Sequence, residues 1–179
     1  MANTGKMISF EIGDVRFNCR AVAVILDRDE RRVLLHRASF EDFWSLPGGR
    51  IEIGEASIEA LKREMREELS VEIEVDRLLW VSEEFFEYMG IKWHGIGLYF
   101  LVRLPADCPI YEHDSWSGIE EFVEDIFVPE DLRAESNKLE LVFQWYDREA
   151  LHELTLYPPF LQEGLKSLPG TTQHVIRYE

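Results

Sequence analysis

Apolar and polar positions alternate, or give way to short apolar runs, along most of the chain. The run AVAVIL lies at the centre of residues 16–27 and predicts a strand, and VLLHR at residues 33–37 predicts a second one. Because the turn-like sequence DRDERR separates the two, we expect them to pair as a hairpin. β-Branched and aromatic residues at 71–87 and 93–104 predict further strands, as does the alternating sequence LELVFQWY at 139–146.

One amphipathic helix is expected over residues 56–69. Its apolar side chains recur at helical spacing and form one narrow stripe, which consists of Ile58, Leu61, Met65 and Leu69. Residues 148–151 and 158–168 predict shorter helical segments, and the tail after Gly170 is expected to be loose.

Residues 105–138 differ from the rest, because they contain three prolines and many acidic residues. We interpret them as an excursion from a core that spans about residues 10–168, with one short helix. The order of hairpin, helix, strands, excursion, strand and helix predicts a single α/β domain over residues 1–179, with a mixed sheet that carries helices on its faces.

Composition supports one globular domain. A chain of 179 residues with 46% hydrophobic and 30% charged residues suits a single sizeable core. The longest strictly apolar run, residues 21–26, is too short to cross a bilayer, and the N-terminal sequence has no secretory signal pattern. Cys19 and Cys108 form no CxxC motif, so we expect reduced thiols and a cytoplasmic protein.

The net charge of −16, from 19 basic and 35 acidic residues, limits which molecules the protein can bind. Long-range repulsion disfavours DNA and long RNA. A small anionic substrate stays compatible with this charge, provided that a metal ion or local basic residues offset the field.

The sequence REMREE at residues 63–68 sets Glu64, Glu67 and Glu68 within one and a half turns of the expected helix. Such a cluster is either a solvated face, as the i, i+4 pair of Glu59 and Arg63 would suggest, or a divalent-cation site. Gly48 and Gly49 lie upstream and can bring bare backbone close to an ion. Carboxylate and carbonyl oxygens suit Mg²⁺ or Mn²⁺, not zinc.

Residues 49–71, GRIEIGEASIEALKREMREELSV, resemble the Nudix box, G-x5-E-x7-R-E-U-x-E-E-x-G-U, in which U is a bulky apolar residue. Eight of the nine specified positions match, namely Gly49, Glu55, Arg63, Glu64, Met65, Glu67, Glu68 and Val71. Ser70 stands where the pattern has glycine. A non-glycine residue in the left-handed conformation costs about 1 kcal/mol, so the departure puts the end of the helix in question and leaves the expected ligands in place.

The resemblance extends over about residues 10–168 and implies an α/β/α sandwich with a mixed sheet. It also implies a hydrolase that uses Mg²⁺ or Mn²⁺ and attacks a pyrophosphate linkage with water. Glu64, Glu67 and Glu68 resemble the family's metal ligands, and the carbonyl of Gly48 resembles its backbone ligand. Arg63 and Glu55 resemble the pair that holds the loop against the helix. Many members of the family dimerise, which makes a homodimer one option, but the sequence leaves the oligomeric state open.

Some members carry a further acidic ligand or base on a later loop, and this sequence leaves its position open. The candidates are Glu140 and Glu135, followed by Glu120 and Glu121, with His94 as an alternative base. Each of them is equally readable as surface charge or, for His94, as a packed strand residue.

Substrate-binding candidates lie outside the box. Arg20, His36 and Arg37 come from the first two expected strands and could face a pyrophosphate, although an arginine could equally pair with an acid. Aromatic residues before the PGG loop could stack on a nucleobase or pack in the core, and these are Phe40, Phe43 and Trp44. Trp116 is a candidate for a lid over the pocket.

The leading hypothesis is a pyrophosphohydrolase for a nucleoside diphosphate derivative, of the nucleotide sugar, ADP-ribose or (d)NTP class. One alternative is a catalytically silent Nudix-like domain that senses a nucleotide. A pyrophosphatase for RNA 5′ ends is another, which the net charge disfavours, and a sanitiser of oxidised nucleotides is neither supported nor excluded. Specificity resides in loops that the box does not encode.

Overall fold

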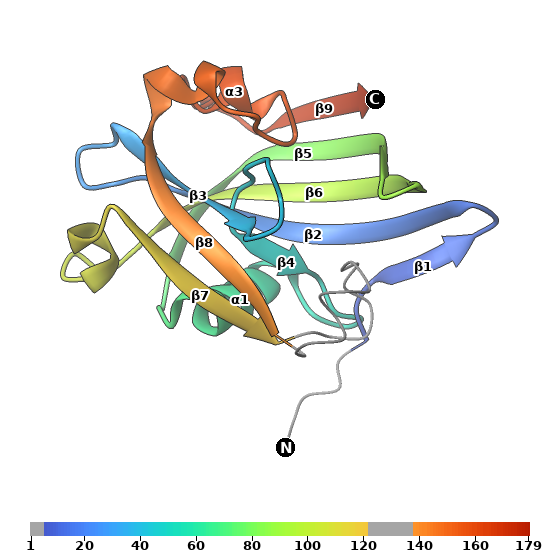
Figure 1. Cartoon of the computed structure of the whole chain (residues 1–179), viewed down its shortest axis with the longest axis horizontal. Coiled ribbons are helices and arrows are strands. Elements are labelled where there is room, and N and C mark those ends of the chain that lie inside the picture. Colours follow the sequence, from blue (N-terminus) through green and yellow to red (C-terminus); the bar gives the residue numbers. More distant parts are fainter. Residues whose placement is uncertain (1–5, 122–137) are drawn as a thin grey trace.

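Two β-sheets and the helices beside them form the body of the protein in this computed structural model, which describes residues 6–121 and 138–179 (Figure 1). The larger sheet is mixed, with strand order β1-β2-β6-β5-β9 and β4 paired to β2, and the smaller one is antiparallel, with order β3-β8-β7. The elements are β1 (Ser9–Ile12), β2 (Val15–Ile25), β3 (Arg32–Ala38), β4 (Gly48–Arg50), α1 (Ser57–Leu69), β5 (Glu74–Tyr88), β6 (Ile91–Arg103), η1 (Pro109–Glu112), β7 (Ser115–Glu121), β8 (Lys138–Asp147), η2 (Arg148–Glu153), α3 (Leu161–Gly164) and β9 (Gln173–Tyr178).

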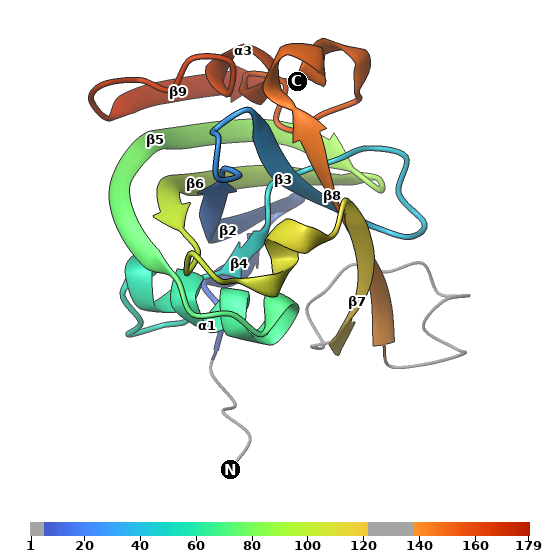
Figure 2. The same cartoon turned by 90° about the vertical axis from the view of Figure 1, so that its left-hand side faces the viewer.

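Strand β2 shows why the chain folds into layers. Its run AVAVIL is buried throughout, because alternate residues enter two different cores. Ala21, Ala23 and Ile25 pack in a cluster with α1, whereas Val22 and Val24 pack in a cluster with α3. Figure 2 shows α1 and α3 on opposite sides of the larger sheet. The α/β/α sandwich with a mixed sheet is therefore confirmed.

The predicted hairpin of the first two strands is wrong. β2 pairs with β1 and β4 along one edge and with β6 along the other, so neither edge is left for β3. Contact between β2 and β3 is reduced to a bridge of Leu26 and Val33, and β3 pairs with β8 in the smaller sheet.

Two further expectations need correction. The tail after Gly170, expected to be loose, forms β9, which pairs in parallel with β5. The expected excursion contains the short helix η1 but also strand β7, which the pattern did not predict and which pairs with β8. Glu135 lies outside the described residues. No helix in residues 6–121 and 138–179 is long and apolar enough to span a membrane.

The helix α1 ends as a glycine-terminated helix would. Ser70 adopts the left-handed conformation, with φ 56° and ψ 35°. Its N–H donates to the carbonyl of Arg66 at 3.0 Å, and the N–H of Val71 donates to the carbonyl of Met65 at 3.3 Å. The bond from residue 70 to residue 66 is that of the αL helix end, so serine takes the left-handed position where the box has glycine and carries the conformational cost itself.

Candidate active site

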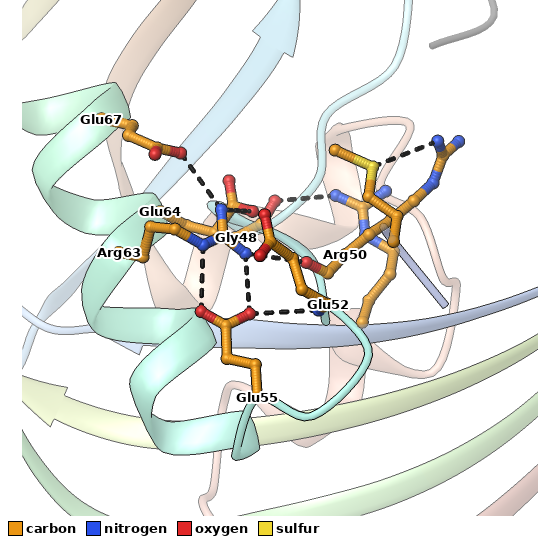
Figure 3. Close-up of polar contacts among 9 residues, drawn as sticks. Gly48, Arg50, Glu52, Glu55, Arg63, Glu64 and Glu67 are labelled. Carbon is orange, nitrogen blue, oxygen red and sulfur yellow. Dashed lines mark hydrogen bonds and ion pairs between the residues drawn. The ribbon is translucent and has the colours of Figure 1, made fainter. Parts of the chain in front are cut away.

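A clasp between Arg63 and Glu55 fastens the loop before α1 to the helix (Figure 3). The Nε and Nη2 atoms of Arg63 each donate to one carboxylate oxygen of Glu55 at 3.0 Å. Nη2 also donates to the carbonyl of Arg50 at 3.1 Å, and Glu55 accepts from the backbone N–H of Glu52 at 3.1 Å. Only 17% of either side chain is exposed. Burial opposes both charges, yet their mutual hydrogen bonds outweigh it, which raises the pKa of Arg63 and lowers the pKa of Glu55.

The same guanidinium sets the position of two expected ligands. Its Nη1 atom donates to Oε1 of Glu64 at 2.7 Å and to Oε2 of Glu67 at 3.1 Å. Glu64 is buried, and burial raises the pKa of its carboxyl against the lowering effect of Arg63, whereas Glu67 is exposed. Glu64 also fits closely against Gly49, because an added Cβ there would lie 2.1 Å from its carboxyl carbon.

Gly48 needs to be glycine for two reasons. Its φ of +138° is strained for any other residue, and an added Cβ would lie 2.3 Å from the carbonyl oxygen of Ala21. The carbonyl of Gly48 accepts a hydrogen bond from Nη2 of Arg20 at 2.8 Å. Arg20 and Arg50 are register partners on β2 and β4, so two cations flank the PGG loop.

The donor set of this region fits a hard divalent cation. The three box glutamates and the Gly48 carbonyl supply only oxygen, and the absence of a side chain at Gly49 is what lets the carboxylate of Glu64 lie against the loop. Within the described part of the chain, no three acidic, histidine or cysteine side chains converge closely enough to enclose a metal ion. Here Arg63 bonds both Glu64 and Glu67, and its charge offsets their repulsion (Figure 3).

A cavity of about 620 Å³ opens beside the PGG loop. Arg20 and Arg50 line it, together with many aromatic side chains, which are Phe40, Phe43, Phe85, Phe86, Tyr88, Trp93, Tyr99 and Tyr157. Aromatic surface with a few charged groups at one end suits a ligand with a flat ring and an anionic part.

Residues expected to bind substrate divide between the cavity and the core. Arg20, His36, Arg37 and Phe43 line the cavity, as does Phe40. Burial, and then the charge of Arg20, lower the pKa of His36 to about 3, so this side chain is neutral at pH 7 and does not supply positive charge.

Arg37 mainly organises the following loop, because its Nη1 atom donates to the carbonyl of Glu41 at 2.6 Å. Trp44 does not line the cavity and packs against Tyr146, with ring centroids 4.9 Å apart. Trp116, the lid candidate, stacks on Phe143 in the smaller sheet and is part of its core.

The structure does not single out a general base among the candidates that the sequence offered. Glu140 lies exposed on β8 and does not line the cavity, and His94 stacks on Phe85. Sequence prediction missed most of the other residues that line the cavity, among them Asn18 on β2 and Glu84 on β5. The signal that could have pointed to them is the pair of glycines in β6, Gly95 and Gly97, since glycine within a strand marks a close approach.

A comparison with known families decides the classification. The model of the NUDIX domain matches residues 18–163. The chain belongs to the NUDIX family. The match includes the box and most of the strands around the cavity, but it ends before β9.

Known relatives resemble parts of this NUDIX chain. It is 35% identical over 96 residues to the RNA pyrophosphohydrolase of Halorhodospira halophila (strain DSM 244 / SL1), which covers 48% of this chain and 53% of that protein. It is 29% identical over 116 residues to the CTP pyrophosphohydrolase of Escherichia coli (strain K12), which covers 62% and 84%. The chain spans less than two thirds of the length of three of the curated relatives that it matches.

A solved structure agrees with the fold. The MutT protein from Methanosarcina mazei Go1 superposes with a TM-score of 0.52 at 18% identity, over 84% of this chain and 93% of that one. At this identity the likeness concerns the fold alone.

Proposed function

We propose that this protein is a divalent-metal-dependent pyrophosphohydrolase for a small nucleoside diphosphate derivative, of the nucleotide sugar, ADP-ribose or (d)NTP class. The observation that carries the proposal is the placement of the Arg63 clasp, with Glu64 and Glu67 on it, beside the 620 Å³ aromatic cavity. Membership of the NUDIX family supports the reaction type, and the names of the relatives support nucleotides as the substrate class.

Glu64, Glu67, Glu68 and the Gly48 carbonyl would hold Mg²⁺ or Mn²⁺. When bound, the cation supplies charge neutralisation at phosphorus and lowers the pKa of a water molecule. Arg63 keeps two of these carboxylates on the same flank of α1, and Glu55 keeps Arg63 in place.

The cavity residues bind and orient the substrate. Arg20 and Arg50 lie next to the PGG loop and offset phosphate charge in a protein whose net charge is −16. The aromatic walls exclude water and cover an apolar ring. In the reaction, the oxygen of water bonds to phosphorus, the bond from phosphorus to the bridging oxygen breaks, and two phosphate-bearing products leave. Glu140 stays our candidate for the base, and Glu135 is the second.

The test is a substrate panel with product identification. It contains UDP-glucose, ADP-ribose, CTP, ATP and dGTP, each with Mg²⁺ or Mn²⁺, and a 5′-triphosphorylated RNA oligonucleotide. We expect turnover of at least one small nucleotide and none without metal. Turnover of the RNA alone would replace our substrate class, and no turnover of any member would contradict the proposal.

The alternative of a silent sensing domain gives a different result. Calorimetry would then detect tight nucleotide binding with no product formed. We also propose a cytoplasmic location, which is supported by two unpaired cysteines, Cys19 and Cys108. A homodimer stays one option, which sedimentation would test.

A further inference from the structure

The floor of the cavity has a feature that the NUDIX box does not explain. Asn18, Gly95, Glu84 and Arg177 are register partners in a row across four adjacent strands, β2, β6, β5 and β9, and all four line the cavity. Residues in register on neighbouring strands share a face of the sheet. The row therefore presents two polar side chains, Asn18 and Glu84, on either side of a bare glycine.

Gly95 is buried, but it lines the cavity and places no side chain in it. An added Cβ at Gly95 would lie 3.2 Å from Oδ1 of Asn18, 3.8 Å from Phe86 and 3.9 Å from Cβ of Glu84. The space above Gly95 is thus bounded by an amide, a carboxylate and an aromatic ring. A flat ligand that enters the cavity at this point meets an amide on one side and a carboxylate on the other.

The two carboxylate oxygens of Glu84 differ in their hydrogen bonding, because only Oε1 accepts hydrogen bonds from the protein. Oε1 accepts from the hydroxyl of Ser82 at 2.5 Å and from the hydroxyl of Tyr99 at 3.0 Å. Among the described residues, none donates a hydrogen bond to Oε2. The two hydroxyls fix the orientation of the carboxylate, so that its second oxygen is a preorganised acceptor.

Asn18 is a nearly buried polar residue that lines the same cavity. Only 7% of the residue is exposed. Within the described part of the chain its side-chain amide makes no hydrogen bond, and the amide atoms that stay accessible face the cavity. An amide and a carboxylate oxygen that line the same cavity and make no hydrogen bond to the described protein are both available to a ligand in it.

We propose that Asn18 and Glu84 recognise the hydrogen-bonding edge of the substrate's nucleobase, which lies on the floor at Gly95. Glu84 accepts from an N–H of the base, and Asn18 bonds the neighbouring ring or carbonyl atom. Phe86 and the other aromatic walls cover the ring face, a surface that a heterocycle fills better than a sugar does. This inference rests on the proposed function, because it names the residues that select the base of that substrate.

The experiment measures binding instead of hydrolysis. Wild-type protein is titrated by calorimetry with CMP, UMP, AMP and GMP, and with ribose 5-phosphate as the ligand without a base. None of these has an anhydride bond, so the result does not depend on catalysis. We expect at least one nucleotide to bind about 10-fold or more tightly than ribose 5-phosphate, as one or two well-placed hydrogen bonds allow.

Three variants test whether the nucleobase binds at this part of the cavity. Glu84→Gln and Asn18→Ala should each weaken binding of the preferred nucleotide about 10-fold and leave ribose 5-phosphate unchanged. Gly95→Ala needs only a small shift of Asn18 and should have the same selective effect, because a methyl group then occupies the floor. Glu83→Gln is the matched control: Glu83 is next in sequence, does not line the cavity and bonds His174, so binding should be unaffected.

Equal binding of nucleotides and ribose 5-phosphate would overturn this inference, and so would variants that bind as wild type does, or no binding at all. Failure of the proposed function looks different, because it is the absence of turnover in the substrate panel. An active enzyme whose Glu84→Gln variant keeps its base preference would contradict the recognition alone.

Discussion

His36 gives a prediction whose size follows directly from its surroundings. The side chain is 7% exposed on β3, and burial, followed by the charge of Arg20, lowers its pKa from 6.5 to about 3, despite an opposing contact with the Leu46 backbone. Between these two pH values the unfolded chain takes up a proton that the folded protein does not. Stability therefore falls as the pH falls through 6.5 and continues to fall toward 3. Linkage gives a loss of about 2 kcal/mol between pH 7.5 and pH 5.

Urea unfolding at these two pH values tests the number. Many carboxylates also titrate at low pH, so the informative quantity is the difference between wild type and His36→Gln, which lacks the titrating ring. Wild type should lose about 2 kcal/mol more than the variant. His152→Gln, at an exposed position, should lose as much as wild type. Equal losses for wild type and His36→Gln would refute the reasoning that His36 is held neutral.

Three further predictions concern residues of the Nudix box. Arg63→Lys removes the bidentate contact with Glu55, so the free energy of unfolding should fall by about 2 kcal/mol, and urea titration would detect it. Ser70→Gly should stabilise the protein by about 1 kcal/mol, because glycine adopts the left-handed conformation without strain, and activity should stay within a few-fold; a large loss of activity would show that the serine itself matters. Mg²⁺ or Mn²⁺ should raise the melting temperature, and Glu68→Gln should reduce that shift; identical shifts would count against Glu68 as a ligand.

Local sequence patterns were sufficient to predict a helix or strand whose formation depends mainly on its own residues. The stripe of Ile58, Leu61, Met65 and Leu69 predicts α1, and the run AVAVIL predicts β2. Burial of these side chains depends little on which partner covers them, except at Ile58, which was expected in the stripe but is 39% exposed. The positions of Glu55 and Arg63 on either side of the helix start likewise follow from the box spacing, and the structure shows them paired.

Which strands pair with one another could not be predicted, since strand pairing depends on contacts between residues that are distant in sequence. Nothing in DRDERR shows that β6 and β4 occupy the edges of β2, so the hairpin with β3 was the natural expectation. The tail became β9 because β5 offers it an edge some 90 residues away in the chain. Asn18 and Glu84 meet only through the register of β2, β6 and β5, which no single segment encodes.

The most direct test of the central claim compares metal-dependent turnover in two glutamate variants of the same helix. Glu68→Gln removes an expected ligand, whereas Glu59→Gln removes a carboxylate that is exposed and paired with Lys62. With the substrate found in the panel and saturating Mg²⁺, kcat should fall about 100-fold or more in Glu68→Gln, because several kcal/mol of charge stabilisation are lost, and should stay near wild type in Glu59→Gln. A folded Glu68→Gln variant that turns over as fast as wild type would contradict the assignment of this helix as the metal site.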